Sequence, residues 1–499
     1  MAKTNRIFSA LKKSFFLASL ALCISAAFPQ SFPSLEPAFT FNSRGPDISL
    51  SPREMITAGL TFSLCTPESA GWKESLSRYD ALERKVLRSR DEIYSAGKTV
   101  ESEKALGEKI LTLMYEDILS RYESGQTRLD TMLLNGTYNC VSSSVLYHAL
   151  AKACGLTVTA QKAPEHAFCT LTLSDGTTVD VETTNPFGFE PGAMHELPSE
   201  GNETRYAVVP RKLYTGRHST SERIHIGLVA GNISAQLMDE KNYAQAVPLA
   251  AARLAFIQEQ SPDADEVRTA LDTICCNYSN EFQKNREHSK AAQWLYAVTE
   301  RWGMTGHIQT YYDNAVRNTV IDAINKKEIL SGRFKEQYER FYPLVSAPVQ
   351  KEINSMLFTE SIIEASQNMS AENAIAYLRN SRETKTAQGD KKIMAQINSL
   401  LEYNWLTKIN DTITSYGYLE GAREADEAVR DLPSSTNLKK LKQQCLQNHA
   451  ITVHNEFAGL ANEGKFSEAR KILEAGLEQN PQSKILLDDL KKLKKILGE

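Results

Sequence analysis

The sequence lacks the features that mark several common kinds of site. Its eight cysteines are scattered over 499 residues without a CxxC pair or a Cys/His zinc spacing, which argues against a zinc finger and a disulfide framework. Lysine and arginine together number 57 against 61 aspartates and glutamates, so there is no basic footprint for nucleic acid. Glycine-rich phosphate loops and dinucleotide fingerprints are also missing. We therefore expect no cofactor, no resident metal and no nucleic-acid partner.

Long hydrophobic runs are missing too, except near the N-terminus. Residues 1–13 carry lysine and arginine but no acidic residue, and residues 14–27 are nearly all apolar or small. This pattern predicts a secretory signal peptide over residues 1–27 and export to the periplasm or outer envelope. Two alternatives stay open. One is an uncleaved membrane tether, and the other is a lipoprotein anchor at Cys23, because residues 20–23 resemble a bacterial lipobox.

The remaining chain is long enough for two or three domains. Residues 28–52 contain five prolines among serine and phenylalanine, which predicts an irregular lead-in or tether. From about residue 53 to 135 the apolar residues recur at helical spacing. After residue 136 the pattern becomes mixed, with β-like runs, and near residue 221 it becomes helical and repetitive. We assign residues 53–220, the first helical segment and the mixed segment, to one domain.

The segment after residue 136 predicts a small mixed unit. A helix should begin at Cys140 and end before Gly155, a residue type that commonly follows a helix C-terminus. Three β-like runs come next, over residues 157–161, 166–173 and 177–184. A Ser-Asp-Gly turn over residues 174–176 separates the last two runs. The expected fold is an α+β core in which the cysteine-bearing helix packs on an antiparallel sheet.

From residue 221 to 499 the sequence is helical and repetitive. The clearest unit covers residues 464–469, where a glycine is followed by an aromatic residue and then by Ala469. Residues 417–422 repeat this pattern, and 47 residues separate Ala422 from Ala469. Weaker copies lie at Phe334, at Tyr243 with Ala246, at Ala291 with Leu295, and at Ala374 with Leu378. The units resemble tetratricopeptide repeats with longer helices, which implies an all-α repeat domain with a concave surface.

Cys140 is the strongest candidate for a reactive residue. A helix N-terminus favours a negative charge, and the thiolate is the nucleophilic form of cysteine. Unpaired backbone N–H groups at that end could also bind a developing oxyanion, and Asn139 is a suitable cap. Cys154 falls at the opposite end of the helix, and Cys169 lies on the strand face opposite to His166. The pattern therefore predicts Cys140 as the nucleophile.

His166 and a carboxylate complete a set of residues suited to acyl transfer. His166 could take the thiol proton and return it to a leaving group, while Glu182 or Asp180 orients the imidazole. Their relative position depends on the turn at residues 174–176. A three-residue loop would place Phe168 opposite Glu182 and make His166 its diagonal neighbour. A two-residue loop would place the histidine and the carboxylate on opposite faces.

These residues resemble a known family. A cysteine that begins a helix, a His-Ala-aromatic run on a strand and a later acidic residue are similar to the transglutaminase-like, papain-related superfamily. The bacterial branch, in which this core precedes tetratricopeptide repeats, is the most similar. In that family the acidic residue lies 16 positions after the histidine, a spacing that selects Glu182 over Asp180. The family more often has aspartate there, and tryptophan where this chain has Phe168.

The resemblance implies an exported cysteine enzyme that acts on an amide bond of a protein or peptide. Peptidase, amidase and transglutaminase activities share a thioacyl intermediate and differ in the acceptor, and we expect hydrolysis. The helical repeats would recruit a protein partner. The alternative is a catalytically inactive scaffold that binds proteins through its repeats. Zinc bound by Cys140 and His166 is a weaker reading, because the spacing matches a triad better.

Overall fold

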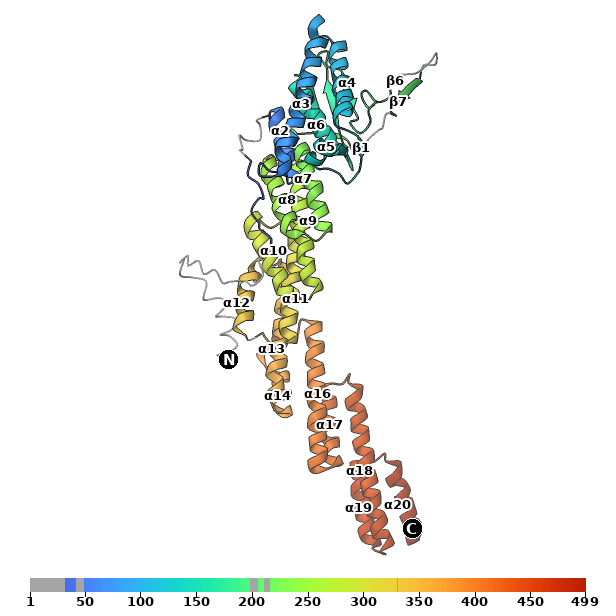
Figure 1. Cartoon of the computed structure of the whole chain (residues 1–499). Helices are drawn as coiled ribbons and strands as arrows, with labels where there is room; N and C mark the ends of the chain where they lie inside the picture. Colours follow the sequence, from blue (N-terminus) through green and yellow to red (C-terminus); the bar gives the residue numbers. More distant parts are fainter. Residues whose placement is uncertain (1–31, 42–48, 198–204, 211–215, 330) are drawn as a thin grey trace. The chain divides into compact units, whose positions relative to one another are not determined.

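The computed structural model describes residues 32–41, 49–197, 205–210, 216–329 and 331–499. The expected signal peptide over residues 1–27 and the lipidation candidate Cys23 lie outside these residues. Within them, each helix is either too short or too polar to cross a bilayer. The chain is mostly helical and contains a small antiparallel sheet (Figure 1).

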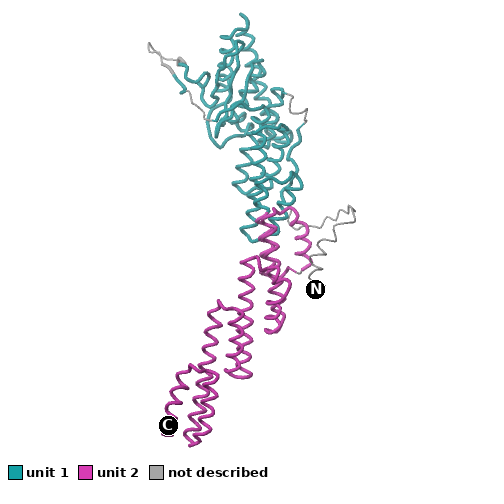
Figure 2. Tube along the Cα trace, turned by 180° about the vertical axis from the view of Figure 1, so that it is seen from behind, with its two compact units in different colours: residues 1–312 teal, residues 313–499 magenta. Residues whose placement is uncertain are grey.

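The chain divides into two compact units, residues 1–312 and residues 313–499 (Figure 2). The domain boundary expected at residue 220 falls inside the first unit. The reason is that α7 (Glu222–Asp239) packs against α2 (Pro52–Phe62) and α6 (Cys140–Ala153). The residue pattern changes near residue 220, where the last strand of the sheet ends. The compact unit extends to residue 312, because the helices after the sheet also belong to it.

In the first unit, one group of helices precedes the strands in the sequence and another group follows them. Its N-terminal helices are α2, α3 (Ala70–Ile93), the 3-10 turn η1 (Tyr94–Ala96), α4 (Val100–Asp117), α5 (Leu129–Asn135) and α6. The helices after the strands are α7, α8 (Tyr243–Ile257), α9 (Pro262–Lys284), α10 (His288–Trp302) and α11 (Gly306–Asn325), which continues into the second unit. Helix α7 packs on α8, α8 on α9, and α9 on α10.

The main sheet is antiparallel and has the strand order β5-β4-β3-β8. Its strands are β3 (Thr157–Ala163), β4 (His166–Thr172), β5 (Thr178–Val181) and β8 (His218–Thr220). The three expected runs appear as β3, β4 and β5. Helix α6 packs on β3 and β4, so the cysteine-bearing helix does lie on an antiparallel sheet (Figure 1).

Two further pairs of short strands were not expected from the sequence. Strand β1 (Arg121–Tyr122) pairs in parallel with β2 (Thr137–Tyr138), and β6 (Met194–Leu197) pairs in antiparallel fashion with β7 (Arg205–Val208). Segments this short show no alternation that could be read. The β1–β2 pair matters for function, because β2 ends two residues before Cys140.

Both faces of β4 are buried, although burial of one face only was expected. Ala167, Cys169 and Leu171 form the expected core face beneath α6. Phe168 on the other face is buried too, because the guanidinium of Arg217 lies 4.8 Å from its ring. The chain before β8 therefore covers the part of the sheet that follows His166.

The described part of the proline-rich lead-in has no helix or strand but packs on the first unit. The ring of Phe32 lies 5.9 Å from that of Phe282 and 5.6 Å from that of Trp294. Phe41 lies 4.6 Å from Phe256 on α8. Aromatic contacts of this kind stabilise packing beyond the area they bury. Of the two expected alternatives, residues 32–41 match the irregular lead-in, and they pack on several helices.

The second unit consists of helices, of which α16 to α20 pack on one another in sequence order. They are the end of α11, α12 (Gly332–Phe341), the 3-10 turn η2 (Tyr342–Leu344), α13 (Ala347–Gln367), α14 (Ala371–Asn380), α15 (Arg382–Ala387), α16 (Lys391–Tyr416), α17 (Tyr418–Asp431), α18 (Thr436–Asn462), α19 (Phe466–Gln479) and α20 (Lys484–Leu497). The repeat alanines Ala374, Ala422 and Ala469 are all buried. Small residues there let neighbouring helices approach closely, which explains the recurring pattern.

Candidate active site

Cys140 is the first residue of α6, and the groups around the helix start leave its own amide available. The side chain of Asn139 accepts hydrogen bonds from the N–H groups of Val141 and Ser142, at 3.0 Å and 3.1 Å. Ser142 Oγ accepts in return from Asn139 N, at 3.0 Å, and completes a capping box. No described residue accepts a hydrogen bond from Cys140 N–H. The thiol thus stands at the positive end of the helix beside an unused backbone donor.

His166 lies between Cys140 and Glu182. Its Nε2 atom is 2.8 Å from Glu182 Oε2, so Nδ1 is the ring nitrogen that can accept the thiol proton. Burial by itself lowers the pKa of His166, but hydrogen bonding with Cys140 and Glu182 outweighs this effect and the pKa is raised to about 9. At neutral pH the imidazole is therefore protonated on both ring nitrogens and carries a positive charge beside the Cys140 side chain.

Glu182 is held in place by its own turn. It is 7% exposed, and its second carboxylate oxygen accepts a hydrogen bond of 2.6 Å from Thr184 Oγ1. Glu182 N donates to Gly188 O at 2.8 Å. A Cβ atom on Gly188 would lie 1.9 Å from Glu182 O, so glycine is required there. The backbone of the turn thus fixes the carboxylate that faces His166.

The strand register explains why Glu182 reaches the histidine. Cys169 pairs with Val181 in the β4–β5 ladder, and Leu173 N donates to Thr177 O at 2.8 Å. This encloses the three residues 174–176, with Gly176 at a φ of 84°. Continued by one residue, the register places Phe168 opposite Glu182. The three-residue loop considered from the sequence is the one that forms.

Asp180, the alternative carboxylate, has a different role. Arg217 Nη1 lies 2.7 Å from Asp180 Oδ2, and Thr170 Oγ1 donates to Asp180 Oδ1 at 2.8 Å. These contacts fasten the chain before β8 onto the sheet. The structure therefore brings Cys140, His166 and Glu182 together, and it pairs Asp180 with Arg217.

The other described cysteines are enclosed. All seven described cysteines are free thiols, and every one except Cys140 is buried. Burial raises the pKa of Cys154 to about 12, and it also raises the pKa of Cys169, whose thiol donates to Ser144 O at 3.4 Å. A thiol that stays protonated and shielded is a poor nucleophile. This leaves Cys140 as the accessible thiol of the described chain.

A cluster of tyrosines beside the triad was missed in the sequence. The hydroxyls of Tyr115 and Tyr138 are 2.9 Å apart, and Tyr115 OH also donates to Thr183 O at 3.1 Å. The ring of Tyr122 lies 5.9 Å from that of Tyr138. The cluster joins the residue after Glu182 to the strand before Cys140. Only the place of Tyr138, two residues before the cysteine, could have drawn attention to it.

Two histidines are buried beneath the site, between α6 and α7. His148 and His225 are 1% and 0% exposed, and their ring centroids are 5.6 Å apart. His225 Nε2 lies 2.8 Å from Ser144 Oγ, while neither ring nitrogen of His148 has a hydrogen-bond partner. Burial lowers the pKa of His148 to about 4 and that of His225 well below its usual value. Both rings are neutral at pH 7 and belong to the helix interface.

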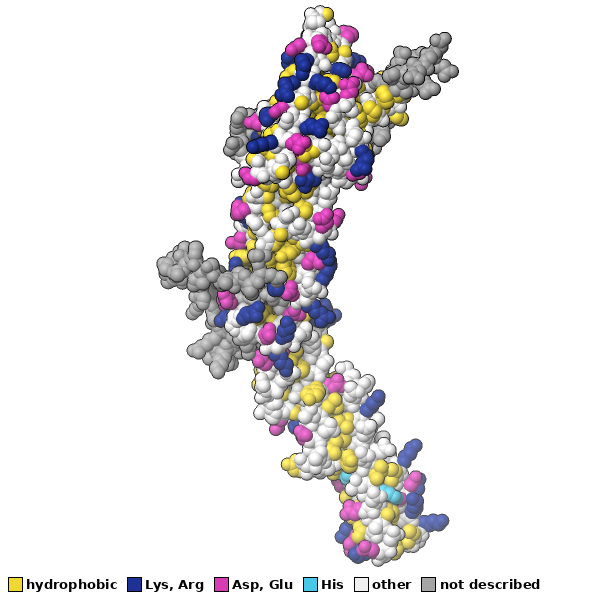
Figure 3. Space-filling model, in the orientation of Figure 1, with side chains coloured by type: hydrophobic (Ala, Val, Ile, Leu, Met, Phe, Trp, Pro, Cys, Tyr) yellow, Lys and Arg dark blue, Asp and Glu magenta, His cyan; other side chains and the backbone are white. Residues whose placement is uncertain are grey.

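The described surface and the described ligand-type residues indicate no other catalytic centre. On the face seen in Figure 3, lysine and arginine side chains of the described chain are interspersed with aspartate and glutamate, without a continuous basic field. No group of three or more histidine, cysteine, aspartate or glutamate side chains among the described residues is arranged to hold a metal ion.

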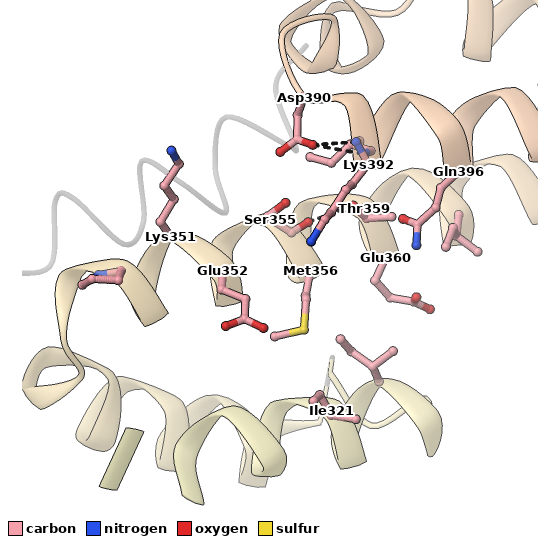
Figure 4. Close-up of a pocket in the computed structure, with 14 residues that line it drawn as sticks. Ile321, Lys351, Glu352, Ser355, Met356, Thr359, Glu360, Asp390, Lys392 and Gln396 are labelled. Atoms are coloured by element: carbon pink, nitrogen blue, oxygen red, sulfur yellow. Dashed lines mark hydrogen bonds between the residues drawn. The ribbon is translucent and has the colours of Figure 1, made fainter. Parts of the chain in front are cut away.

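The second unit contains a cavity of about 570 Å³ between α11, α13 and α16. Met356 and Glu360 on α13 point toward Ile321 on α11 (Figure 4). Burial and the nearby charge of Glu364 raise the pKa of Glu360, which forms no ion pair with a described residue. The walls are thus mixed, with apolar side chains beside the carboxylate of Glu360 and the lysines Lys351 and Lys392.

Comparisons with known proteins do not assign a family. No protein-family model matches the chain, and no curated protein is significantly similar to it. One solved structure, described as the crystal structure of menin that reveals the binding site for the Mixed Lineage Leukemia protein, aligns with 79% of this chain and 93% of its own. The identity is 12% and the TM-score 0.26, values too low to support any argument about fold or function.

Proposed function

We propose that the chain is a cysteine-dependent acyl-transfer enzyme that hydrolyses an amide bond in a protein or peptide. The observation that carries this proposal is the hydrogen-bonded series Cys140–His166–Glu182 at the start of a helix. A thiol, an imidazole and a carboxylate in this order form a nucleophile, a base and the group that orients the base. The chain contributes all three side chains itself and needs no cofactor for this chemistry.

The geometry supports a two-step reaction. The Cys140 thiolate attacks the carbonyl carbon, and the charge that develops on the carbonyl oxygen can be met by the Cys140 N–H. The His166 imidazolium then protonates the leaving amine, the C–N bond breaks and a thioester remains. In the second step, neutral His166 takes a proton from water as it attacks the thioester. The carboxylic acid leaves, and the thiolate–imidazolium pair is restored.

The test is the rate of iodoacetamide alkylation of each cysteine against pH, read by peptide mass spectrometry on the chain without residues 1–27. We expect Cys140 to react far faster than Cys275 or Cys445, both of which are buried. The rate at neutral pH should drop in His166→Ala, because the thiolate loses its cationic partner. Equal rates at all three cysteines would refute the proposal.

A second measurement distinguishes the enzyme proposal from the alternative of an inactive scaffold. Cys140→Ala removes the nucleophile without disturbing the cap, whose bonds come from Asn139 and Ser142. If this variant restores every property of a strain that lacks the gene, while a variant of the second unit does not, the scaffold alternative is correct. The enzyme proposal requires that Cys140→Ala behave like the deletion.

We also propose that the first unit has a transglutaminase-like core. The support is the order of the parts, with a cysteine at a helix N-terminus, a histidine that begins a strand and an acidic residue after the next strand. The exported location, in the periplasm or outer envelope, rests on the composition of residues 1–27. Cleavage of the precursor, detected by N-terminal sequencing of the mature chain, would test it.

The second unit is proposed to recruit a protein partner through tetratricopeptide-like repeats. The cavity beside Met356 supports this role, because it offers apolar surface together with charged side chains such as that of Glu360. The test is chemical crosslinking of the chain to its protein partner. Met356→Arg places a long side chain in the cavity and should abolish recovery of the crosslinked complex. Ile451→Arg, at an exposed position of α18 that does not line the cavity, is the control. Both variants should retain fast alkylation of Cys140.

A further inference from the structure

Tyr122 stands out among the tyrosines beside the site because its hydroxyl is uncommitted. Tyr115 and Tyr138 use their hydroxyls on each other and on Thr183 O. Tyr122 forms no hydrogen bond with a described residue, and 48% of its side chain is exposed. A phenolic hydroxyl can donate as well as accept, and an unused donor at the edge of a reactive centre is available to a substrate.

The backbone places Tyr122 next to the nucleophile. In the parallel pair of β1 and β2, Tyr122 lies opposite Tyr138, and Glu123 N donates to Tyr138 O at 2.8 Å. Asn139, which follows Tyr138, also holds the segment after β1 in place, because its Nδ2 donates to Ser124 O at 3.1 Å. The short strand β1 therefore runs along the chain that leads into Cys140, on the side where α6 begins.

The electrostatic surroundings agree with this position. Burial raises the pKa of Tyr122, and the charges of Cys140 and Glu182 raise it further. The pairing of β1 with β2 and the 5.9 Å between the rings of Tyr122 and Tyr138 place this tyrosine beside the triad. Its hydroxyl keeps its proton at neutral pH and is a donor there.

A carbonyl oxygen that becomes an oxyanion needs more than one donor. The Asn139 side chain occupies the amides of Val141 and Ser142, so the backbone at the helix start offers Cys140 N–H alone among the described groups. An oxyanion site usually combines such an amide with a second donor, often from a side chain. The segment that β1 holds beside Cys140 is where such a donor would have to come from.

We infer that the Tyr122 hydroxyl is the second oxyanion donor of the Cys140 site. The inference rests on the proposed function, since it needs a carbonyl substrate that Cys140 attacks. When the thiolate adds to the carbonyl carbon, the C=O π electrons move onto oxygen. Cys140 N–H and Tyr122 O–H then both donate to that oxygen, and neither group gives up its proton.

The experiment compares two reagents that modify the same thiol. Iodoacetamide alkylates Cys140 by displacement at carbon and forms no oxyanion, whereas p-nitrophenyl acetate acylates it through a tetrahedral oxyanion and releases p-nitrophenolate. Both rates are measured on the full chain without residues 1–27. Tyr122→Phe keeps the ring and removes only the hydroxyl. Tyr416→Phe, at a 78% exposed tyrosine in the second unit, is the matched control.

Tyr122→Phe should slow acylation of Cys140 roughly 100-fold, the usual effect of removing one oxyanion donor. Its alkylation rate and its pH dependence should equal those of the parent chain. Acylation at the parental rate in Tyr122→Phe overturns the inference, and so does an effect seen only in Tyr122→Ala, which would assign the ring a packing role. If the parent is neither alkylated nor acylated quickly at Cys140, the proposed function fails and the inference fails with it.

Discussion

At the residue scale, the contact between His166 and Glu182 sets the protonation of the site. The carboxylate raises the pKa of His166 by bonding to its charged form, and its own position is fixed by Thr184 and by the close approach at Gly188. Asp180, two residues away, has the same chemistry but a different partner, Arg217. The two carboxylates therefore form a matched pair for experiment.

Glu182→Gln should lower the pKa of His166 from about 9 by one to two pH units, because a neutral amide no longer stabilises the imidazolium. NMR titration of labelled histidine measures this change directly. Asp180→Asn should leave the His166 titration close to that of the parent chain. An equal drop in both variants would show that general loss of negative charge, and not the 2.8 Å contact, holds the proton.

Part of this residue-scale picture could be predicted from the sequence. Cys140, His166 and Glu182 were predicted because each side chain begins or follows an element whose local pattern is clear. Their register could be reduced to two loop lengths but not decided, since the choice depends on the backbone conformation at Gly176. Tyr122 escaped prediction because it lies on a two-residue strand inside a segment with a helical pattern.

At the scale of elements, the interface between α6 and α7 contains a built-in sensitivity to acid. His148 is neutral in the fold and is surrounded by His225, Lys152 and Glu222. A histidine in the unfolded chain has a pKa near 6.5, whereas folded His148 has a pKa of about 4. Between these two pH values the unfolded chain therefore binds a proton that the folded chain does not. Stability should therefore fall as the pH drops through this window.

His148→Leu should remove the part of this dependence that comes from His148 and leave the part that comes from His225. At pH 5 the neutral buried ring costs on the order of 2 kcal/mol relative to pH 8, and leucine has no proton to bind. Denaturant unfolding at the two pH values, followed by tryptophan fluorescence, gives the difference in the free energy of unfolding. An unchanged difference in His148→Leu would assign the acid sensitivity to other groups. His218→Leu is the contrasting variant: Asp263 raises the pKa of His218, so this side chain stabilises the fold at acid pH and its loss should enlarge the difference instead of reducing it.

The lead-in over residues 32–41 is an element without regular structure, and its contribution should be measurable. Phe41→Ala should lower the free energy of unfolding of the first unit by about 2 kcal/mol, less than the 3–5 kcal/mol of a fully buried ring. Glu36→Ala, which removes only an exposed contact with Arg301, should change it by less than about 0.5 kcal/mol. Equal effects in the two variants would show that Phe41 does not stabilise the packing.

Helix boundaries and β-strands differ in how far sequence could locate them. The helix at Cys140 was predicted because its cap and its end are both marked by residue type. Strands β6 and β7 have four residues each and β8 has three, and unlike the equally short β5 they are not joined by a recognisable turn to a longer strand. Burial of Phe168 could not be foreseen either, since it depends on Arg217, which is distant in sequence.

At the scale of the whole molecule, the second unit contains hydrophobic clusters of its own. In the second unit, Trp405 is 1% exposed and its indole N–H donates to Asp431 at 2.8 Å. Trp405, Ile397 and Leu401, all on α16, belong to one cluster of buried hydrophobic side chains. The expected boundary at residue 220 missed this division, because helical texture alone does not reveal which helices pack with the sheet.

Trp405→Ala should destabilise the second unit by about 3–5 kcal/mol and leave the first unit intact. Differential scanning calorimetry should show one transition moving to lower temperature while the other keeps its position. Cys140 alkylation should keep the parental rate throughout. A joint shift of both transitions, with slower alkylation, would show that the two units unfold as one.

The packing of the lead-in also governs when the first unit can be completed during synthesis. The ring contact between Phe32 and Trp294 joins residues about 260 positions apart. At ribosomal rates of about 5–20 residues per second, the early segment waits on the order of 10–50 s before its partner is made. Phe41 can pack on Phe62 and Phe256 before α10 is made, whereas Phe32 stays exposed until Trp294 is available, so docking of Phe32 is a late step in folding of the first unit.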